Sequence, residues 1–226
     1  MYYDIVGCNM RILGAVHHLP PTGGAFPSWV WDAFQWSELI EMEHDRAELG
    51  ACVLDPQTRM LKPWAALFAK LGQAFSSISV LPGVETVFSS ALEATRRPPM
   101  TYIESGRFLG ALLDSVPAPD IGKAEAAMDA AMPNMLANIK RLHSAWEQSN
   151  IPALEAAQAE SPLGSIASMR HAFFTARNEN WANTIASRGA QAKRHLLVVG
   201  ALHLVGPENL LDQLTFRGRS AVRLIS

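Results

Sequence analysis

Residues 194–206 read R-H-L-L-V-V-G-A-L-H-L-V-G, an apolar run that ends in Gly-Ala-Leu-His. A short run that is rich in Val and Leu and bounded by glycine is typical of a buried parallel strand. The same arrangement occurs near the start of the chain, where residues 10–17 read M-R-I-L-G-A-V-H. We therefore predict two strands, each with an imidazole at its carboxyl end, His17 on the first and His203 on the second.

These two histidines are the first candidates for a functional site. In open α/β sheets, ligand sites form in the crevice beyond the carboxyl ends of the strands, so His17 and His203 meet there if the two strands are close neighbours. Gly14 and Gly200 would let the backbone turn or approach a ligand without a Cβ in the way. The alternative is that both imidazoles are buried and bonded to backbone carbonyls.

Composition limits the class of protein. The chain has 226 residues, 49% of them hydrophobic, which is enough to bury the core of one globular domain. The net charge is −2 without long runs of one sign, so nucleic acid is not the expected partner. No apolar run reaches the roughly 18 residues of a membrane span. Neither a signal peptide nor a disulfide framework is visible, which predicts a cytoplasmic protein unless a leader has been removed.

The order of the elements predicts an α/β fold with a central, mostly parallel sheet flanked by helices. A hairpin-like start leads into the first motif strand, and a Pro/Gly loop then precedes a short helix at 29–36. From 58 to 161 the sequence is Ala-rich and amphipathic, which predicts a helical insertion between the core segments 1–57 and 162–226. Within it we expect a short strand ending at Glu104 and one long helix over 121–148, kinked near Pro133.

The second predicted strand, 37–45, carries three acids. Glu41, Glu43 and Asp45 are two residues apart, so they share one face of the strand. Acids on a buried strand are costly unless a metal ion, an arginine or exposure at the strand end compensates them. The alternative is an acidic edge strand that faces solvent.

A predicted helix over 165–188, ended by Gly189, carries Arg177, Asn178 and Trp181. Trp181 lies one turn beyond Arg177 and therefore stacks near it. The other histidines fit structural roles, and three serines fit helix N-caps, since no Gly-x-Ser-x-Gly elbow surrounds them. These residues are His44, His143, His171, His195, Ser28, Ser105 and Ser161.

Three blocks of sequence resemble a known family. The first holds L-G-A-V-H-H-L-P and L-I-E-M-E-H-D, the middle L-P-G-V-E and Y-I-E-S-G-R-F, and the last A-R-N-E-N-W-A-N-T-I and V-V-G-A-L-H-L-V-G. Paired Gly-x-x-His motifs with an intervening Arg-Asn resemble the TraB/GumN family, relatives of the Tiki metalloproteases. This resemblance implies an α/β fold of the erythromycin-esterase and ChaN-like group with a helical insertion. His18, which doubles the first histidine, Glu85, where an Asp is common, and the short middle depart from the pattern.

The resemblance also implies a hydrolase that depends on a divalent metal and is peptidase-like, with a peptide or a small molecule as its substrate. His17 and His203 match the motif histidines and Glu43 the acid that ends the second strand, so these three are expected to hold the ion. Such a set leaves a coordination position for a water of lowered pKa. Mixed N and O ligands without thiolate suit Zn, Mn or Co.

The remaining matched residues are expected to act on the substrate. Arg177 and Asn178 match the family's Arg-Asn pair and would stabilise a developing oxyanion. Glu104 matches an acid of the middle block, and Glu104 or Glu41 is a candidate general base.

Three other functions fit the same residues. In a metal-independent esterase, His17 would be the general base and Glu43 would orient it. In a non-catalytic haem-binding or metal-binding protein, the paired histidines would ligate iron. A non-catalytic surface or assembly protein would use neither histidine chemically.

Overall fold

The protein is described by a computed structural model that covers residues 1–23, 25–189 and 191–224. Its centre is a six-stranded sheet in the order β6-β4-β7-β2-β1-β8. Strands β2, β7, β4 and β6 run parallel, whereas β1 is antiparallel to β2 and β8. The strands are β1 Tyr2–Ile5, β2 Met10–Ala15, β4 Leu39–His44, β6 Thr101–Glu104, β7 His195–Gly200 and β8 Ala221–Arg223. The predicted α/β class and mostly parallel sheet are confirmed.

The two motif strands are neighbours. β7 lies between β2 and β4, and Ala15 of β2 pairs with Gly200 of β7. Every residue of β7 is buried, which explains its unbroken apolar run. His17 follows β2 by two residues, and His203 lies in a 3₁₀-helix, η3 (Ala201–Leu204), one turn beyond the strand end predicted for it. Both imidazoles therefore leave the same edge of the sheet.

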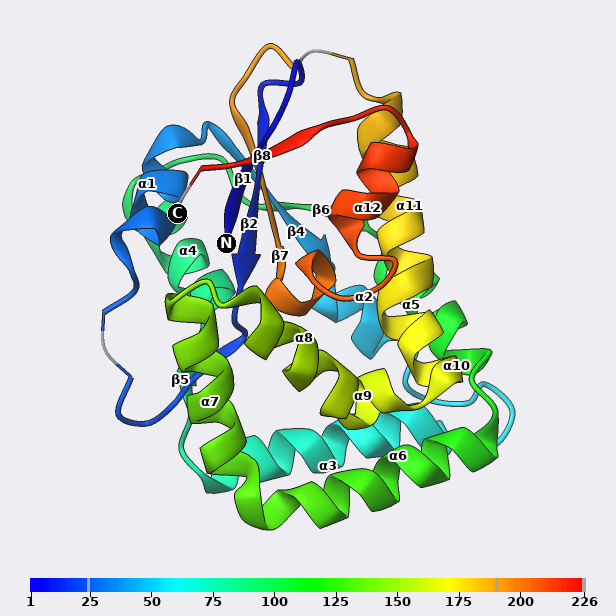
Figure 1. Ribbon diagram of the computed structural model, residues 1–226. Coiled ribbons are helices and arrows are strands. Elements are labelled where there is room, and N and C mark those ends of the chain that lie inside the picture. The colour runs from blue at the N-terminus through cyan, green and yellow to red at the C-terminus, as the bar shows by residue number, and fades with distance from the viewer. Residues whose placement is uncertain (24, 190, 225–226) are drawn as a thin grey trace.

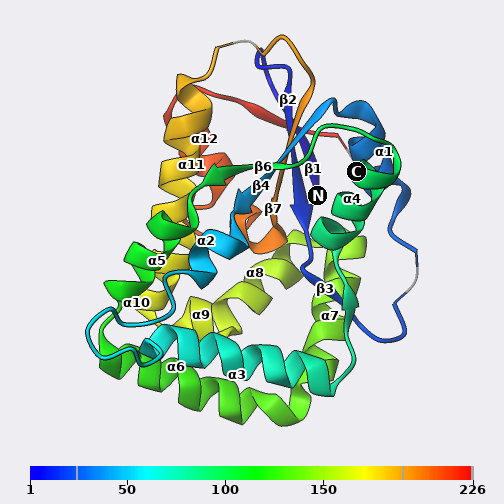
Figure 2. The same cartoon turned by 180° about the vertical axis from the view of Figure 1, so that it is seen from behind.

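Helices cover both faces of the sheet, as Figures 1 and 2 show: α1 and α4 lie on one side, α11 and α12 on the other. The rings of Phe34 and Phe88 join α1 to α4, with centroids 4.9 Å apart. The backbone of Pro27, and not the side chain of Ser28, stands at the N-cap of α1, so the cap predicted for Ser28 is wrong. The bounds are α1 Ser28–Trp36, α4 Val84–Ala94, α11 Ala176–Ser187 and α12 Leu210–Phe216.

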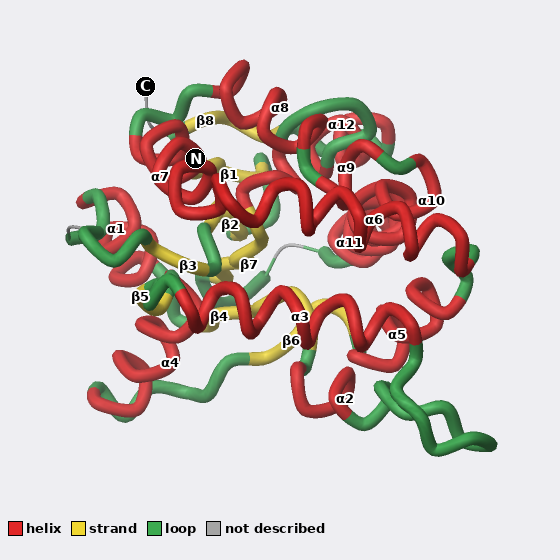
Figure 3. The backbone as a smooth tube through the Cα atoms, turned by 90° about the horizontal axis from the view of Figure 1, so that it is seen from below, coloured by secondary structure: helices red, strands yellow, loops and turns green. Residues whose placement is uncertain are grey.

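A second layer of helices lies across the carboxyl ends of the strands. Seen from below in Figure 3, α3 crosses the strands and α6 runs beside it. Both contribute to a smaller apolar core, which Trp64, Met128 and Phe173 share. The helices of this layer are α3 Pro63–Ser77, α5 Gly106–Asp114, α6 Ala118–Ala131, α7 Met135–Glu147, α8 Ile151–Glu160 and α9 Pro162–Ser165. This layer covers the edge of the sheet beyond which His17 and His203 lie.

The structure does not confirm residues 58–161 as a helical insertion. β6 from this segment is an edge strand of the main sheet, α4 packs in the main core, and Trp146 donates its indole N–H to the carbonyl of Gly14 at 2.7 Å. The single helix predicted over 121–148 is two helices, because a 3₁₀ turn at Met132–Asn134, where the kink at Pro133 was predicted, separates α6 from α7. Figure 1 shows that α7 then turns sharply away from α6.

The helix predicted over 165–188 is three pieces. A short α10 (Ala167–Arg170) is followed by a five-residue π-helix, η2 (His171–Thr175), and then by α11. The helix ends at an extended Arg188, so the C-cap predicted at Gly189 is wrong by one residue. π-Helical turns add a residue to the helical repeat and are frequent at functional sites.

The remaining elements are small, and two of them border the site. α2 (Arg46–Gly50) follows β4, and β3 (His18–Leu19) pairs antiparallel with β5 (Leu81–Pro82). Ser105 and Ser161 accept N-cap hydrogen bonds from backbone N–H groups, as predicted. No helix within the described residues is both long enough and apolar enough to span a membrane.

Candidate functional site

Three of the predicted site residues meet around Gly200. A Cβ added to Gly200 would lie 3.1 Å from His17 Nε2, 3.3 Å from Glu43 Oε1 and 3.5 Å from His203 Cδ2. The backbone N–H of Gly200 donates a short hydrogen bond to Glu43 Oε1. Any larger residue here would press on its neighbours, and the side chains of His17, Glu43 and His203 share one location, which we call the Gly200 cluster.

His17 is oriented by a residue that the sequence did not identify as part of the site. Its Nδ1 lies 2.8 Å from Oε1 of Glu85, in the first turn of α4, and Glu85 also pairs with Arg46. Burial disfavours the charged imidazole, but the carboxylates of Glu85 and Glu43 outweigh it and raise the pKa of His17 to about 9. The ring is therefore fixed at Nδ1, and its Nε2 faces the Gly200 cluster.

His203 is oriented in the same way by a different residue. Its Nδ1 lies 2.7 Å from Oδ1 of Asn178, an acceptor, so Nδ1 carries the proton and the lone pair of Nε2 faces Arg177 Nη1 at 3.3 Å. Its ring packs against Trp181 at 4.5 Å and Phe174 at 5.1 Å. Burial and the charge of Arg177 lower the pKa of His203 to about 3 against the opposing effect of Glu43, so the ring is neutral.

Both imidazoles therefore have side-chain oxygens as partners, and the alternative of backbone carbonyl partners is wrong. Asn178 is held in turn, because its Nδ2 donates to the carbonyl of Glu208 at 3.0 Å. The π-helix η2 directly precedes this part of α11 and carries Phe174, one of the two rings against His203.

Arg177 holds the two buried acids. Its Nε donates to Glu104 Oε1 at 2.7 Å and its Nη2 to Glu43 Oε2 at 2.8 Å. Trp181 lies 4.6 Å from the guanidinium carbon and donates its indole N–H to Glu104 Oε2 at 2.8 Å. His44 was predicted to face away from the acids, but its Nδ1 lies 4.0 Å from Glu43 Oε2 and 3.4 Å from Arg177 Nη2.

The shared arginine sets the charge states of the two acids. Burial alone would raise the pKa of Glu43, but the charge of Arg177 outweighs it and lowers that pKa below its ordinary value. Burial dominates at Glu104, so its pKa is raised despite the same arginine. An arginine, one of the three compensations considered for the acids of this strand, is present at Glu43.

The other two acids of β4 have separate partners. Glu41 forms a bidentate pair with Arg188, at 2.7 and 2.9 Å, and lies 3.5 Å from Nε2 of His195. Asp45 caps α2 by accepting the backbone N–H of Ala47 at 2.8 Å. β4 lies inside the sheet, so the alternative of a solvent-facing edge strand is wrong.

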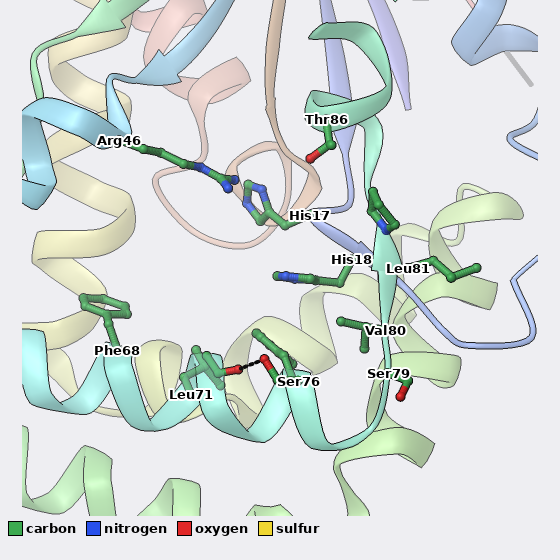
Figure 4. Close-up of a pocket in the computed structure, with 13 residues that line it drawn as sticks. His17, His18, Arg46, Phe68, Leu71, Ser76, Ser79, Val80, Leu81 and Thr86 are labelled. Carbon is green, nitrogen blue, oxygen red and sulfur yellow. Dashed lines mark hydrogen bonds between the residues drawn. The ribbon is translucent and has the colours of Figure 1, made fainter. Parts of the chain in front are cut away.

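A cavity of about 530 Å³ opens beside the Gly200 cluster. Figure 4 shows Arg46 reaching toward His17 on one side and the side chains of α3 on the other. The cavity lies between α3, the β3–β5 pair and the start of α4. Its lining residues are His17, His18, Arg46, Phe68, Leu71, Gly72, Phe75, Ser76, Ser79, Val80, Leu81, Pro82 and Thr86.

Two residues of this region were missed at the sequence level. Glu85 stands in the L-P-G-V-E block, whose Gly83 donates its backbone N–H to the carbonyl of His17 at 3.1 Å. A Cβ on Gly83 would lie 2.1 Å from the carbonyl oxygen of Val16, so only glycine lets α4 begin against this loop. The L-P-G-V-E block could have identified Glu85 as a site residue from the sequence, whereas no motif points to Arg46.

The chain matches the TraB/PrgY/gumN family model over residues 37–223. It belongs to this family. The matched range contains most of the chain, including Glu43, Arg177 and His203, and begins after His17. No curated protein and no solved structure matches the chain.

The contacts bear on whether this member of the TraB/PrgY/gumN family can hold a metal ion. Within the described residues, no group of three or more His, Cys, Asp or Glu side chains is arranged to hold one. Arg177 takes Glu43 Oε2 and lies 3.3 Å from His203 Nε2. The donor chemistry nevertheless fits, because metal-binding histidines commonly have their second ring nitrogen held by an oxygen, as those of His17 and His203 are.

Proposed function

We propose that the protein is a hydrolase of amide or ester bonds that depends on a divalent ion, Mn, Co or Zn, held by His17, His203 and Glu43. One observation carries the proposal: both rings are fixed at Nδ1 by side-chain oxygens and present their other edge to the carboxylate beside Gly200. A bound ion would lower the pKa of a water and polarise a carbonyl oxygen. Membership of the TraB/PrgY/gumN family supports this proposal through the resemblance to Tiki metalloproteases.

Arg177 and Asn178 are positioning residues in this proposal. Every donor group of the Arg177 side chain has a protein partner, and only 4% of that side chain is exposed. The amide oxygen of Asn178 accepts from His203, and its amide nitrogen donates to the carbonyl of Glu208. The first fixes the carboxylate of Glu43 and the second fixes the tautomer of His203, which differs from the direct oxyanion contact expected from the sequence.

Glu104 helps to hold Arg177 in place. Its two oxygens accept from Arg177 and Trp181, so neither is directed at the Gly200 cluster. This favours a role in holding Arg177 over that of a general base. Glu41, the other candidate base, is paired with Arg188.

A metal-independent hydrolase is the second candidate, because the His17–Glu85 pair at 2.8 Å also resembles a general base with its orienting acid. Since the pKa of His17 is raised to about 9, this base would be fully available only above that pH. His17 has 43% of its side chain exposed, enough to reach a substrate in the cavity. In this version Glu85, rather than the Glu43 proposed from the sequence, orients the ring. The haem-binding and non-catalytic alternatives stay predictions.

Cobalt absorption tests the metal directly. We expect Co²⁺ added to the protein to give visible d–d bands that are lost in His203→Ala and in Glu43→Gln and kept in His171→Ala, whose ring is exposed and outside the cluster. In parallel, hydrolysis of p-nitrophenyl acetate should stop after treatment with a chelator and return with Mn²⁺, Co²⁺ or Zn²⁺. Full hydrolysis after verified metal removal would contradict the metal-dependent mechanism and favour the metal-independent one with the His17–Glu85 pair.

A further inference from the structure

The cavity beside His17 has an apolar wall formed by one face of α3. Phe68, Leu71 and Phe75 are spaced by three and four residues, so they lie on one side of the helix, and all three are only half-buried. Val80 and Leu81 line the cavity as well. Figure 4 shows that Phe68 and Leu71 lie on the side of α3 that faces His17 and His18. These apolar side chains gain from a ligand that covers them.

The charge of the wall narrows the kind of ligand. No carboxylate is among the lining residues, and Arg46 alone among them carries a permanent positive charge. Its side chain is 69% exposed and pairs with Glu85, which leaves guanidinium N–H groups for a ligand. A ligand with a cationic side chain is therefore disfavoured in the cavity. A ligand with an apolar group next to a carbonyl group fits better, because the apolar group matches the wall and the carbonyl oxygen matches Arg46.

Gly72 keeps space open in this wall. It lies inside α3, where glycine costs about 1 kcal/mol relative to alanine. No heavy atom lies within 4 Å of a Cβ placed there, so close packing within the protein does not explain the glycine. A larger side chain at this position would enter the cavity without meeting the backbone.

We propose that this cavity binds a bulky apolar side chain on the acyl side of the scissile bond, with the carbonyl carbon beside His17 and its oxygen toward Arg46. This rests on the proposed hydrolase function and names its substrate class: amides or esters of acids with a bulky apolar side chain. The oxygen of water bonds to the carbonyl carbon and the C–N or C–O bond breaks. The leaving nitrogen or oxygen takes a proton from that water, and no redox change occurs.

Filling the cavity tests this subsite. The substrates are p-nitrophenyl esters of N-acetylphenylalanine and N-acetylalanine, compared in wild type and Gly72→Phe. Gly122→Phe is the matched control, because Gly122 also lies inside a helix, α6, with no heavy atom within 4 Å of its Cβ position. Wild type should prefer the phenylalanyl ester in kcat/KM by about 10-fold or more. Gly72→Phe should abolish this preference, Gly122→Phe should keep it, and an unchanged preference in Gly72→Phe would overturn the inference.

A binding measurement separates this inference from the hydrolase proposal. N-acetylphenylalaninamide titrated into the protein and followed by NMR should bind wild type and Gly122→Phe, and should bind Gly72→Phe at least 10-fold more weakly. Binding of this kind without hydrolysis of either ester would keep the subsite and remove the hydrolase. Hydrolysis without side-chain preference, together with equal binding by all three proteins, would keep the hydrolase and remove the subsite.

Arg46 is tested by its own pair of variants. Arg46→Ala should lower kcat for the phenylalanyl ester by about 10²-fold with a smaller change in KM, as for loss of an oxyanion donor, and Arg46→Lys should recover part of it. An unchanged kcat in Arg46→Ala would overturn the role of Arg46.

Discussion

Arg177 and Arg46 both lie near the Gly200 cluster and differ in burial and in the number of their partners. Arg177 has 4% of its side chain exposed and is bonded to Glu43 and Glu104, with Trp181 stacked on it. Arg46 has 69% exposed and one carboxylate partner, Glu85. The buried arginine has no donor left for a substrate, whereas the exposed one does.

This difference separates two tasks, the compensation of buried acids and the contact with a substrate, of which the second was expected of Arg177 from the sequence. A buried pair of acids needs a charge that cannot leave, because desolvated carboxylates without a partner are costly. A substrate needs a charge that can change partners, and an exposed pair that contributes little to stability meets that need. We therefore expect loss of the charge at Arg177 to impair folding, and loss of the charge at Arg46 to impair the proposed substrate recognition.

The largest effect is expected from Arg177→Met. It leaves Glu43 and Glu104 buried without a compensating charge, and we expect the free energy of unfolding to fall by about 3–5 kcal/mol. Urea denaturation followed by tryptophan fluorescence measures this. Arg177→Lys, which keeps the charge but not the two-sided hydrogen bonding, should lose less. A loss below about 1 kcal/mol in the Met variant would mean that the buried acids are not charged.

Gly200→Ala should come second, because it acts on the boundary between the two regions. The new methyl group would press on His17 and Glu43 at 3.1–3.3 Å, which costs about 1–3 kcal/mol when neighbours must move. Calorimetric unfolding gives this value, and Co²⁺ binding should weaken in parallel. Gly122→Ala, in an open helical position, should instead be neutral or stabilising. Equal behaviour of the two alanine variants would show that the cluster has slack.

His195→Leu extends the comparison to a third arginine, Arg188, which pairs with Glu41. His195 lies beside this pair, with its Nε2 3.5 Å from Glu41. Both ring nitrogens of His195 are buried without a hydrogen-bond partner among the described residues, and burial lowers the pKa of His195. Below pH about 6.5 the unfolded chain then binds more protons at this residue than the folded one, so stability falls as the pH falls, by at most about 1.4 kcal/mol per pH unit.

The leucine variant should be at least as stable as wild type at pH 7 and should lose less stability between pH 6.5 and pH 5. Urea midpoints at both pH values measure this, with the exposed His171→Leu as control. Parallel pH dependence in wild type and His195→Leu would contradict the lowered pKa.

The smallest effect on folding is expected from Arg46→Met. An exposed ion pair contributes about 0–1 kcal/mol, so the free energy of unfolding should change by less than that. Thermal unfolding beside Arg177→Met gives the direct contrast. A loss comparable with that of the Arg177 variant would abolish the distinction between a structural and a recognising arginine.

The position of the Gly200 cluster was predictable because it follows from strands. Two apolar runs that each end in Gly-x-x-His place His17 and His203 beyond neighbouring strands, and alternation along the next strand places Glu43 with them. That inference required the two motif strands to be close neighbours, and the strand order of the sheet meets this condition. Whether the cluster binds a metal does not follow, because the distances among its donor atoms depend on packing around Gly200.

The surroundings of the cluster were less predictable. The engagement of Arg177 depends on Glu104, which is 73 residues away in sequence, and no local pattern reveals that pairing. The π-helix at His171–Thr175 is invisible to a 3.6-residue periodicity. Arg46 is an ordinary helix-start residue until the fold places it beside His17.

The central place of β7 has a consequence for biosynthesis. The strand that joins β2 to β4, and the histidine just beyond it, leave the ribosome only after β2, β4 and β6 have been made. A nascent or prematurely terminated chain that lacks them has two sheet halves with nothing between them. Pairings of such long sequence separation form slowly. The Gly200 cluster, and with it the chemistry proposed for it, therefore cannot assemble until β7 and His203 have been synthesised.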